Sequence, residues 1–372
     1  MRGYVFVLLV AATVTYLTTP AARRLARRLG AITPLRDRDV HAVPMPRMGG
    51  SAMLLGVAVA LVFARQVPFF APVFAGGRGP YVVLASATAV CLLGVADDLW
   101  QLDAVTKLAG QALAAGVMAW QGVQLVSLPI AGVTILSPLV LIGLTVLAVV
   151  VTINAVNFVD GLDGLAAGIV GIAGSAFFVY SYLLSRDATP DSYASLASLI
   201  TAALVGSCLG FLPHNFNPAR IFMGDSGSML IGLLLATSTV AITGQVDPTV
   251  VAQAKIVPAF FPVVLPLAVL ALPLIDLVLA VVRRTRAGQM PWHPDKMHLH
   301  HRMLELGHSH ARAVLILYVW TATLAFGVAS VAFVSLPTAI GLGSVAVVIA
   351  LALTLGPLRG RRATLRHATD AG

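Results

Sequence analysis

The chain has 372 residues, of which 58% are hydrophobic and 10% charged, and its mean hydropathy is +0.92. Soluble domains have roughly 45–50% apolar and about 25% charged residues, so this composition excludes a soluble globular protein. The net charge of +9 is therefore attributed to membrane topology and to attraction for anionic lipid or a polyanionic substrate, not to nucleic-acid binding. The two cysteines, Cys91 and Cys208, lie in apolar runs and indicate neither a disulfide framework nor a metal site.

Eleven apolar runs are candidate membrane spans, because a hydrocarbon core of about 30 Å needs around 20 helical residues. In chain order they are 4–19, 50–63, 81–96, 105–120, 135–153, 165–184, 193–212, 228–242, 257–282, 313–333 and 339–355. The first run precedes its positive charges, so we expect a retained span and not a signal peptide. We predict an all-α polytopic membrane protein with about 11 transmembrane helices, comprising one transmembrane catalytic domain (1–358) and a basic cytoplasmic tail (359–372).

Basic residues set the predicted orientation. With the N-terminus outside, all but five of the 24 Lys and Arg residues fall in inner loops, the exceptions being Arg2, Arg65, Arg78, Arg186 and Lys255. The positive-inside rule then predicts a cytoplasmic C-terminus. All but three of the 15 acidic residues also fall in or beside inner loops. Because acidic residues contribute little to topology, this distribution indicates an active site for a polyanion and a metal ion on the cytoplasmic loops.

One polar stretch interrupts two long apolar runs. Its side chains are Asn154, Asn157, Asp160 and Asp163, followed by Gly164. Carboxylates at a membrane boundary are costly and imply a function. In one straight helix these four positions would drift by about half a turn, so we expect the helix to break near the glycines of this stretch. The alternative is a hinge whose polar side chains only cap the next helix.

The second inner loop contains the adjacent carboxylates Asp97 and Asp98, with Lys107 in the following helix. Neighbouring carboxylates repel each other unless a cation or a shared proton relieves them, and such an oxygen-rich pair suits Mg²⁺. A solvated acidic helix end is the alternative. The first inner loop is predicted from Ala21 to Arg47, and its arginines before residue 30 are interpreted as a basic segment facing lipid. For His41 and Arg47 that interpretation and a role in the site are both kept as alternatives.

The fourth inner loop carries Asn215, Phe222 and Asp225. The segment Gly224-Asp-Ser-Gly resembles the surroundings of a trypsin-like nucleophile, but a chain that offers only helices excludes that β-barrel protease. An aspartate among small residues before a span fits a metal or phosphate site, with a plain helix N-cap as the alternative.

The last inner loop, from Arg283 to Arg312, contains His298, His300 and His301. His298 and His301 could share one helical face and His300 could not, so a three-histidine zinc site would need irregular backbone. With Arg302 alongside, the imidazoles are more typical of a diphosphate-binding site.

Four motifs on successive inner loops together resemble those of the polyprenyl-phosphate N-acetylhexosamine-1-phosphate transferases, glycosyltransferase family 4. The motifs are Asp97-Asp98, Asn154-x-x-Asn157-x-x-Asp160-Gly-x-Asp163-Gly, Asn217-Pro-Ala-x-Ile-Phe-Met-Gly-Asp225 and His298-Leu-His300-His301-Arg302. The last resembles the N-acetylglucosamine-1-phosphate branch (WecA and TagO type), whereas the muramoyl-pentapeptide branch (MraY type) usually has a run of histidines followed by an acidic residue. Asp39 departs from the family, which often has a basic residue before the histidine at position 41.

The resemblance implies transfer of N-acetylglucosamine 1-phosphate from UDP-N-acetylglucosamine to undecaprenyl or decaprenyl phosphate, with release of UMP. This would be the first lipid-linked step of an envelope glycan such as lipopolysaccharide, arabinogalactan or teichoic acid, in the bacterial cytoplasmic membrane. Another UDP-sugar, including the phospho-MurNAc-pentapeptide donor, is the first alternative. A secondary transporter is a remote one, because its ionisable residues would lie near the bilayer midplane.

The resemblance also implies the residue roles. The catalytic residues would be Asp97, Asp98, Asp225, His300 and His301, with Mg²⁺ (or Mn²⁺) on Asp225 and Asp98 and with Asp97 as a helper or a general base. The substrate would contact Lys107, Asn154, Asn157, Asp160, Asp163, Asn215, Phe222, His298 and Arg302. The bilayer is the expected partner, nucleic acid is not, and a homodimer is left open.

Overall fold

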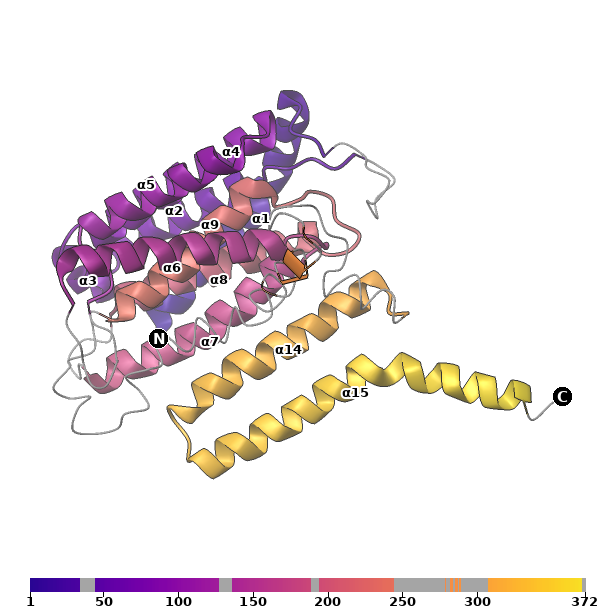
Figure 1. Ribbon diagram of the computed structural model, residues 1–372. Coiled ribbons are helices and arrows are strands. Elements are labelled where there is room, and N and C mark those ends of the chain that lie inside the picture. Colours follow the sequence, from indigo (N-terminus) through magenta and orange to yellow (C-terminus); the bar gives the residue numbers. More distant parts are fainter. Residues whose placement is uncertain are drawn as a thin grey trace.

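The computed structural model describes residues 1–33, 44–126, 136–188, 194–243 and 307–369, together with the isolated positions 278, 282–283, 285–286 and 288. Over these residues the chain is all-α, and its long helices lie side by side in one bundle (Figure 1). Nine of the described helices are long and apolar enough to cross a membrane. The predicted class, a polytopic all-α membrane protein, is therefore confirmed for this part of the chain.

The helices follow one another through four of the described segments. They are α1 (Arg2–Leu29), α2 (Gly49–Gln66), a short 3-10 helix η1 (Pro68–Phe70), α3 (Ala71–Ala75), α4 (Gly79–Trp100), α5 (Ala104–Trp120), α6 (Pro138–Val159), α7 (Leu165–Ala188), α8 (Leu196–Asn215) and α9 (Gly224–Thr243). After the interval that the structure does not describe come α14 (His310–Val331) and α15 (Leu336–Thr369). The last helix thus continues through most of the predicted basic tail, to Thr369.

Nine of the eleven predicted spans coincide with helices that could cross a membrane. The run at 105–120 forms the 17-residue helix α5, which is not among those nine, and the run at 257–282 lies almost entirely outside the described residues. The helices are generally longer than the apolar runs that predicted them. Helix α4, for example, continues past the apolar run to Trp100, so Asp97 and Asp98 lie in its last turn and not in a loop. Polar residues at the ends of spans can remain helical because the helix continues beyond the hydrocarbon.

The predicted start of the first inner loop at Ala21 is wrong. Helix α1 continues for two more turns, through Arg27 and Arg28, and ends where Gly30 adopts the left-handed conformation (φ 76°). A cation in the last turn of a helix interacts favourably with the negative end of the helix dipole, so these arginines are compatible with helix. The first 20 or so residues of α1 are enough to cross the membrane, so its last two turns, which carry the arginines, extend beyond the hydrocarbon.

Helix α9 forms the centre of the bundle. It packs against α2, α4, α6 and α8, and 94% of its apolar stretch is buried, whereas only 11% of that of α15 is buried. Helices α14 and α15 lie at one side, with α14 against α7 (Figure 1). The side chains that begin α9, including Asp225, are therefore held by several surrounding helices.

Close contact between α1 and α8 depends on two small residues. A Cβ at Gly206 would lie 2.3 Å from the carbonyl oxygen of Leu8, and one at Gly210 would lie 2.2 Å from that of Ala12. Both distances are shorter than atoms can tolerate, so only glycine permits this approach. Spacing of small residues by four positions is a recurrent solution for helix association in membranes, where no hydrophobic effect drives helices together.

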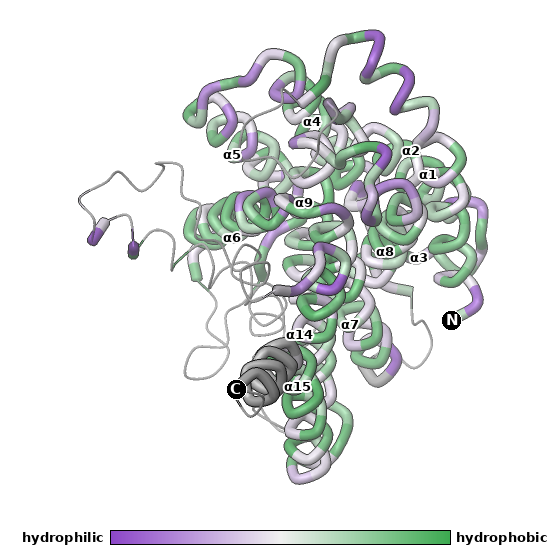
Figure 2. The backbone as a smooth tube through the Cα atoms, turned by 90° about the vertical axis from the view of Figure 1, so that its right-hand side faces the viewer, coloured by the Kyte–Doolittle hydropathy of each residue, from purple (hydrophilic) through white to green (hydrophobic). Residues whose placement is uncertain are grey.

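The polar residues gather at one end of the bundle. Seen from that end, the helix shafts are coloured mainly as hydrophobic, and hydrophilic stretches occur where helices end and loops connect them (Figure 2). The ends of α4, α6 and α8 and the starts of α5, α7 and α9 meet there, as the contacts described below show.

Candidate active site

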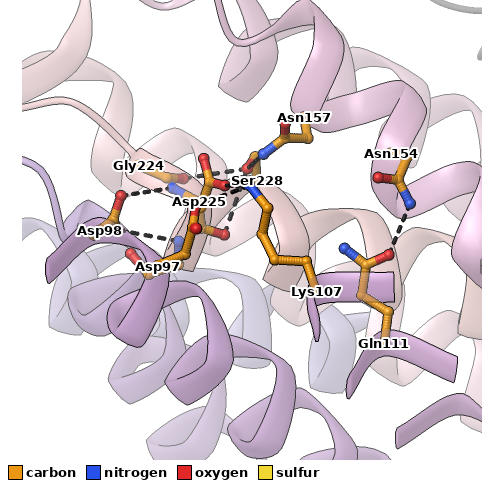
Figure 3. Close-up of polar contacts among 10 residues, drawn as sticks. Asp97, Asp98, Lys107, Gln111, Asn154, Asn157, Gly224, Asp225 and Ser228 are labelled. Atoms are coloured by element: carbon orange, nitrogen blue, oxygen red, sulfur yellow. Dashed lines mark hydrogen bonds and ion pairs between the residues drawn. The ribbon is translucent and has the colours of Figure 1, made fainter. Parts of the chain in front are cut away.

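A lysine between two carboxylates forms the centre of the site. Lys107, on the first turn of α5, places its Nζ 3.1 Å from Oδ2 of Asp97 and 3.2 Å from Oδ2 of Asp225 (Figure 3). The Asp97 and Asp225 side chains are 9% and 16% exposed, so these ion pairs are partly shielded from water. Three residues far apart in the chain are thus brought to one point by α4, α5 and α9.

Asp98 has a different environment from its neighbour. Its Oδ1 accepts a hydrogen bond from the backbone N–H of Asp225 (3.0 Å) and its Oδ2 accepts one from the N–H of Ser226 (3.2 Å). These are among the first N–H groups of α9, which have no partner within the helix. Asp98 therefore acts as an N-cap supplied by another helix, and its negative charge suits the positive end of the α9 dipole.

The start of α9 is approached on two sides by backbone. A Cβ at Gly94 of α4 would lie 2.4 Å from Cα of Ser226, and one at Gly50 of α2 would lie 2.2 Å from the backbone nitrogen of Gly227. Neither position can carry a side chain without moving a helix. This close packing fixes the direction in which Asp225, in the same turn, presents its carboxylate.

The two asparagines of α6 make different contacts. Nδ2 of Asn157 donates to Oγ of Ser228 on α9 at 2.9 Å. Nδ2 of Asn154, one turn earlier, donates to Oε1 of Gln111 on α5 at 2.7 Å (Figure 3). Gln111 is 1% exposed, so this amide pair lies within the bundle beside the Lys107 centre. The amides link α6 to both helices that carry the charged residues.

The predicted helix break after Asn157 is confirmed. Helix α6 ends at Val159, Gly164 has φ 77°, and α7 begins at Leu165. Asp163, 2% exposed, accepts hydrogen bonds at Oδ2 from Nδ2 of Asn217 (3.1 Å) and from the N–H of Ala219 (3.0 Å). Through Asp163, the segment between α6 and α7 thus binds the loop between α8 and α9, in addition to turning the chain.

Asn215 completes the connection between these two loops. Its Oδ1 accepts from the N–H of Gly164 at 3.1 Å, and its Nδ2 donates to the carbonyl oxygen of Ile221 at 3.0 Å. The side chain is 3% exposed. Asn215 and Asp163 therefore hold the loop that leads to Phe222 and Asp225 in place against the α6–α7 break.

Asp160 and Arg47 form a second charged region. Burial raises the pKa of Asp160 to about 7, and the positive charge of Arg47 opposes that rise. Arg47 also acts electrostatically on Asp98, while its own Nε is buried and has no hydrogen-bond partner among the described residues. Arg47 is therefore a second cation of the site, separate from Lys107.

The backbone around Arg47 is hydrogen-bonded to the segment before Asp225. The N–H of Phe222 donates to the carbonyl oxygen of Pro46 at 2.9 Å, and the N–H of Gly49 donates to that of Phe222 at 3.1 Å. Phe222 and Arg47 are thus set on adjoining segments. Phe222 is half-buried, so part of its aromatic ring is accessible for stacking against a flat ligand.

Most of the predicted site residues come together in the structure. Asp97, Asp98, Lys107, Asn154, Asn157, Asp160, Asp163, Asn215, Phe222 and Asp225 lie at the same end of the bundle through the contacts given above. The predicted His298, His300, His301 and Arg302 lie outside the described residues. Their roles remain predictions.

Two residues of the site were not predicted from the sequence, namely Gln111 and Ser228, and for Arg47 a role in the site was only one of two alternatives. Gln111 is four positions after Lys107, so both lie on one face of α5, and that spacing could have identified it. Ser228 and Arg47 are visible only through contacts with other helices and loops. The sequence around Ser228 gives no such signal.

Two carboxylates among the described residues suit part of a Mg²⁺ coordination shell. Among them no group of three or more His, Cys, Asp or Glu side chains could hold a metal. Mg²⁺, however, typically takes one or two carboxylates and completes its shell with water and substrate oxygens. Asp97 and Asp225, which already share a cation, offer such a pair, while both oxygens of Asp98 are engaged by α9.

Comparison with known proteins identifies the class. Residues 80–243 match the family model for glycosyl transferase family 4, and the chain belongs to this family. It is 45% identical to the decaprenyl-phosphate N-acetylglucosaminephosphotransferase of Mycolicibacterium smegmatis, over 97% of the chain and 90% of that protein. It is 30% identical to a probable undecaprenyl-phosphate N-acetylglucosaminyl 1-phosphate transferase of Bacillus subtilis (86% of the chain, 82% of that protein). A phospho-N-acetylmuramoyl-pentapeptide-transferase of Desulforudis audaxviator is also 30% identical (87% and 97%).

Proposed function

We propose that the protein transfers N-acetylglucosamine 1-phosphate from UDP-N-acetylglucosamine to a polyprenyl phosphate and releases UMP. The observation that carries this proposal is the near full-length similarity to decaprenyl-phosphate N-acetylglucosaminephosphotransferases. Four such proteins are 44–45% identical to this chain over 97% of its length. We further propose decaprenyl phosphate as the acceptor and a bacterial cytoplasmic membrane as the location.

The orientation follows from charge. In the proposed topology the N-terminus is outside and the site end of the bundle faces the cytoplasm, because most basic residues lie on that side. A soluble nucleotide sugar can reach this end, while the phosphate of a membrane-anchored acceptor lies at the same level. The two reactants thus meet at the membrane surface without either crossing it.

We assign the metal to Asp225 and Asp97. Both substrates are anions, so charge neutralisation and positioning form the main catalytic problem, and Mg²⁺ supplies positive charge to the donor diphosphate when bound. The contacts favour Asp97 over Asp98 as the second ligand, because each Asp98 oxygen already accepts a backbone hydrogen bond. Asp98 instead positions Asp225 by capping α9.

In this proposal Lys107 contacts the same two carboxylates, Asp97 and Asp225, that would bind the metal. Its ammonium offsets one of the two carboxylate charges in the structure and can donate to a phosphate oxygen when substrate binds. The acceptor phosphate needs no strong base, because a phosphate monoester with a second pKa near 6 is already mostly a dianion at neutral pH. Asp97 therefore acts as a ligand or an orienting group.

The donor nucleotide is assigned to the wall formed by the α6–α7 break and the loop before α9. Asp160 and Phe222 lie on this wall, with Asp163 and Asn215 fixing its two loops to each other. Asn154 and Asn157 tie the wall to α5 and α9. By the family resemblance, His300, His301 and Arg302, with His298 beside them, contact the diphosphate and the departing UMP.

A donor panel tests the proposal. Purified protein in detergent with Mg²⁺ and decaprenyl phosphate should release UMP from UDP-N-acetylglucosamine and form a lipid-linked sugar diphosphate. The same assay with UDP-N-acetylgalactosamine, UDP-glucose and UDP-MurNAc-pentapeptide should give much slower release. Preference for the pentapeptide donor would overturn the assigned sugar, and UMP release from none of them would overturn the reaction class.

A further inference from the structure

Three arginines that the proposed reaction does not use come together at the site end of α1. Arg23 and Arg27 lie one turn apart on α1, and Arg220 belongs to the loop between α8 and α9. Arg27 and Arg220 are both near enough to Arg23 for their positive charges to act unfavourably on it. Such a grouping of like charges is unfavourable unless an anion joins it.

The loop is held against α1 by contacts independent of charge. Nε2 of His214, at the end of α8, donates to the carbonyl oxygen of Tyr16 at 3.0 Å, and the two rings lie 4.8 Å apart. The N–H of Arg220 in turn donates to the carbonyl oxygen of His214 at 2.9 Å. Tyr16, Arg23 and Arg27 are spaced by seven and four residues, so they share the face of α1 to which the loop is attached.

The guanidinium groups have no anionic partner in the described part of the chain. None of the three arginines forms an ion pair there. The Nε of Arg23 is buried and makes no hydrogen bond with the described residues. A buried donor without a partner is costly, and an arginine fork matches the oxygens of a phosphate. The ligand that best suits this cluster is therefore a phosphate group.

The cluster lies at the depth of lipid headgroups. Helix α1 has 28 residues and is about 42 Å long, whereas the hydrocarbon core is about 30 Å thick. Counted from the start of α1, about 20 residues cross the hydrocarbon, and the turns that carry Arg23 and Arg27 come next. Phosphates of bilayer lipids occupy this level on the leaflet that faces the site.

We propose that Arg23, Arg27 and Arg220 bind the phosphate of an anionic phospholipid from the surrounding bilayer. The occupant is a resident lipid and not the acceptor, because the catalytic carboxylates interact mainly with other cations. Those cations are Lys107, near Asp97 and Asp225, and Arg47, near Asp98 and Asp160. A phosphate held by the cluster would be kept away from the reacting groups.

The bound lipid would also stabilise the donor wall of the site. Beside Arg220, the N–H of Ala219 donates to Asp163, and two residues further on the N–H of Phe222 donates to the carbonyl oxygen of Pro46. Fixing Arg220 therefore limits the movement of the segment that leads to Asp225. We expect the transfer rate to be higher in a bilayer that contains an anionic phospholipid.

Native mass spectrometry of the full chain, purified with mixed phosphatidylcholine and phosphatidylglycerol, tests binding directly. The wild type should retain one phosphatidylglycerol in preference to phosphatidylcholine. Each guanidinium near an anionic surface contributes about five-fold in affinity, so Arg23→Gln/Arg27→Gln should weaken retention by roughly 25-fold. The chain provides a matched control in Arg24→Gln/Arg28→Gln, which removes equal charge at the same spacing from a neighbouring face of α1. Equal loss in both double variants would show general electrostatic attraction and overturn the site.

Activity in vesicles tests the consequence and the choice of occupant. In vesicles of equal parts phosphatidylcholine and phosphatidylglycerol, the wild type and the Arg24/Arg28 control should be several-fold faster than in phosphatidylcholine alone. In both kinds of vesicle, the Arg23/Arg27 variant should have the transfer rate that the wild type has in phosphatidylcholine alone. If this variant instead raises the KM for decaprenyl phosphate in phosphatidylcholine vesicles, the cluster binds the acceptor and the proposal is wrong. Lipid retention does not depend on turnover, so failure of the proposed reaction remains distinguishable.

Discussion

Replacing Lys107 by methionine tests whether the central carboxylates are the metal site. Methionine keeps most of the side-chain length and removes the charge that Asp97 and Asp225 share in the structure. The two carboxylates then face each other without compensation. A divalent cation at the same place would restore the balance, so Lys107→Met should depend on Mg²⁺ for stability more strongly than the wild type does.

The size of the effect follows from the geometry. Both Oδ2 atoms lie within 3.2 Å of one nitrogen, so they are no more than about 6.4 Å apart. At an effective dielectric constant of about 20, two negative charges at that distance repel by about 2.6 kcal/mol, and charges closer than that repel more strongly. Lys107 is 27% exposed, so water reduces the effect, and we expect a loss near 2 kcal/mol in EDTA.

Thermal denaturation in detergent, with EDTA and then with saturating Mg²⁺, measures this difference. A cation at about 100 times its Kd stabilises by about 2.7 kcal/mol, enough to recover the whole loss and to raise Tm by a few degrees. Gln111→Met is the matched control, because it alters the same face of α5 without removing charge. If Mg²⁺ raises the Tm of Lys107→Met no more than that of the control, these carboxylates do not form the metal site.

Three further changes separate the other roles. Asp98→Asn loses one of two charge-assisted hydrogen bonds to α9, so we expect stability to fall by about 1 kcal/mol. We also expect a lower kcat with little change in Mg²⁺ affinity, measured by Mg²⁺ titration of activity. A large drop in that affinity would make Asp98 a metal ligand. Asp160 has a pKa raised to about 7 when folded and an ordinary one when unfolded, so the folded state binds the proton more tightly and stability is lost as pH rises from about 4 to 7. Asp160→Asn should remove that slope in Tm against pH, and an unchanged slope would assign it to another group. Gly210→Ala brings a methyl group to 2.2 Å from the Ala12 carbonyl oxygen and should cost about 1–3 kcal/mol, while Gly143→Ala, with no neighbour within 4 Å, should cost nothing; equal Tm values would contradict the close packing of α1 on α8.

Apolar runs predicted the fold well because the membrane imposes a simple rule. Lipid cannot satisfy exposed backbone groups, so a long uncharged run must be helical, and ten predicted spans are observed as helices. The ends were less predictable. Arg23 to Arg28 and Asp97 with Asp98 are polar but helical, because helices continue into the headgroup region where polar side chains are no longer costly.

The site was predictable in membership but not in detail. Asp97, Lys107 and Asp225 could be grouped because the predicted topology places their segments at one membrane face. The partners of Asp98, in contrast, could not be predicted from the sequence. It is adjacent to Asp97, yet the two point to different partners, one capping α9 and the other pairing with Lys107. That distinction depends on the approach of α4 to α9 at Gly94, which is a tertiary contact.

One assay tests the assignment of metal-dependent sugar-phosphate transfer to Asp225. UMP release from UDP-N-acetylglucosamine is followed with decaprenyl phosphate and a Mg²⁺ titration, for the wild type and for Asp225→Asn of equal Tm. This assignment predicts Mg²⁺-dependent release by the wild type and loss of at least about 100-fold in the variant, comparable to removal of one key electrostatic group. Near-normal, Mg²⁺-dependent release by Asp225→Asn would contradict it.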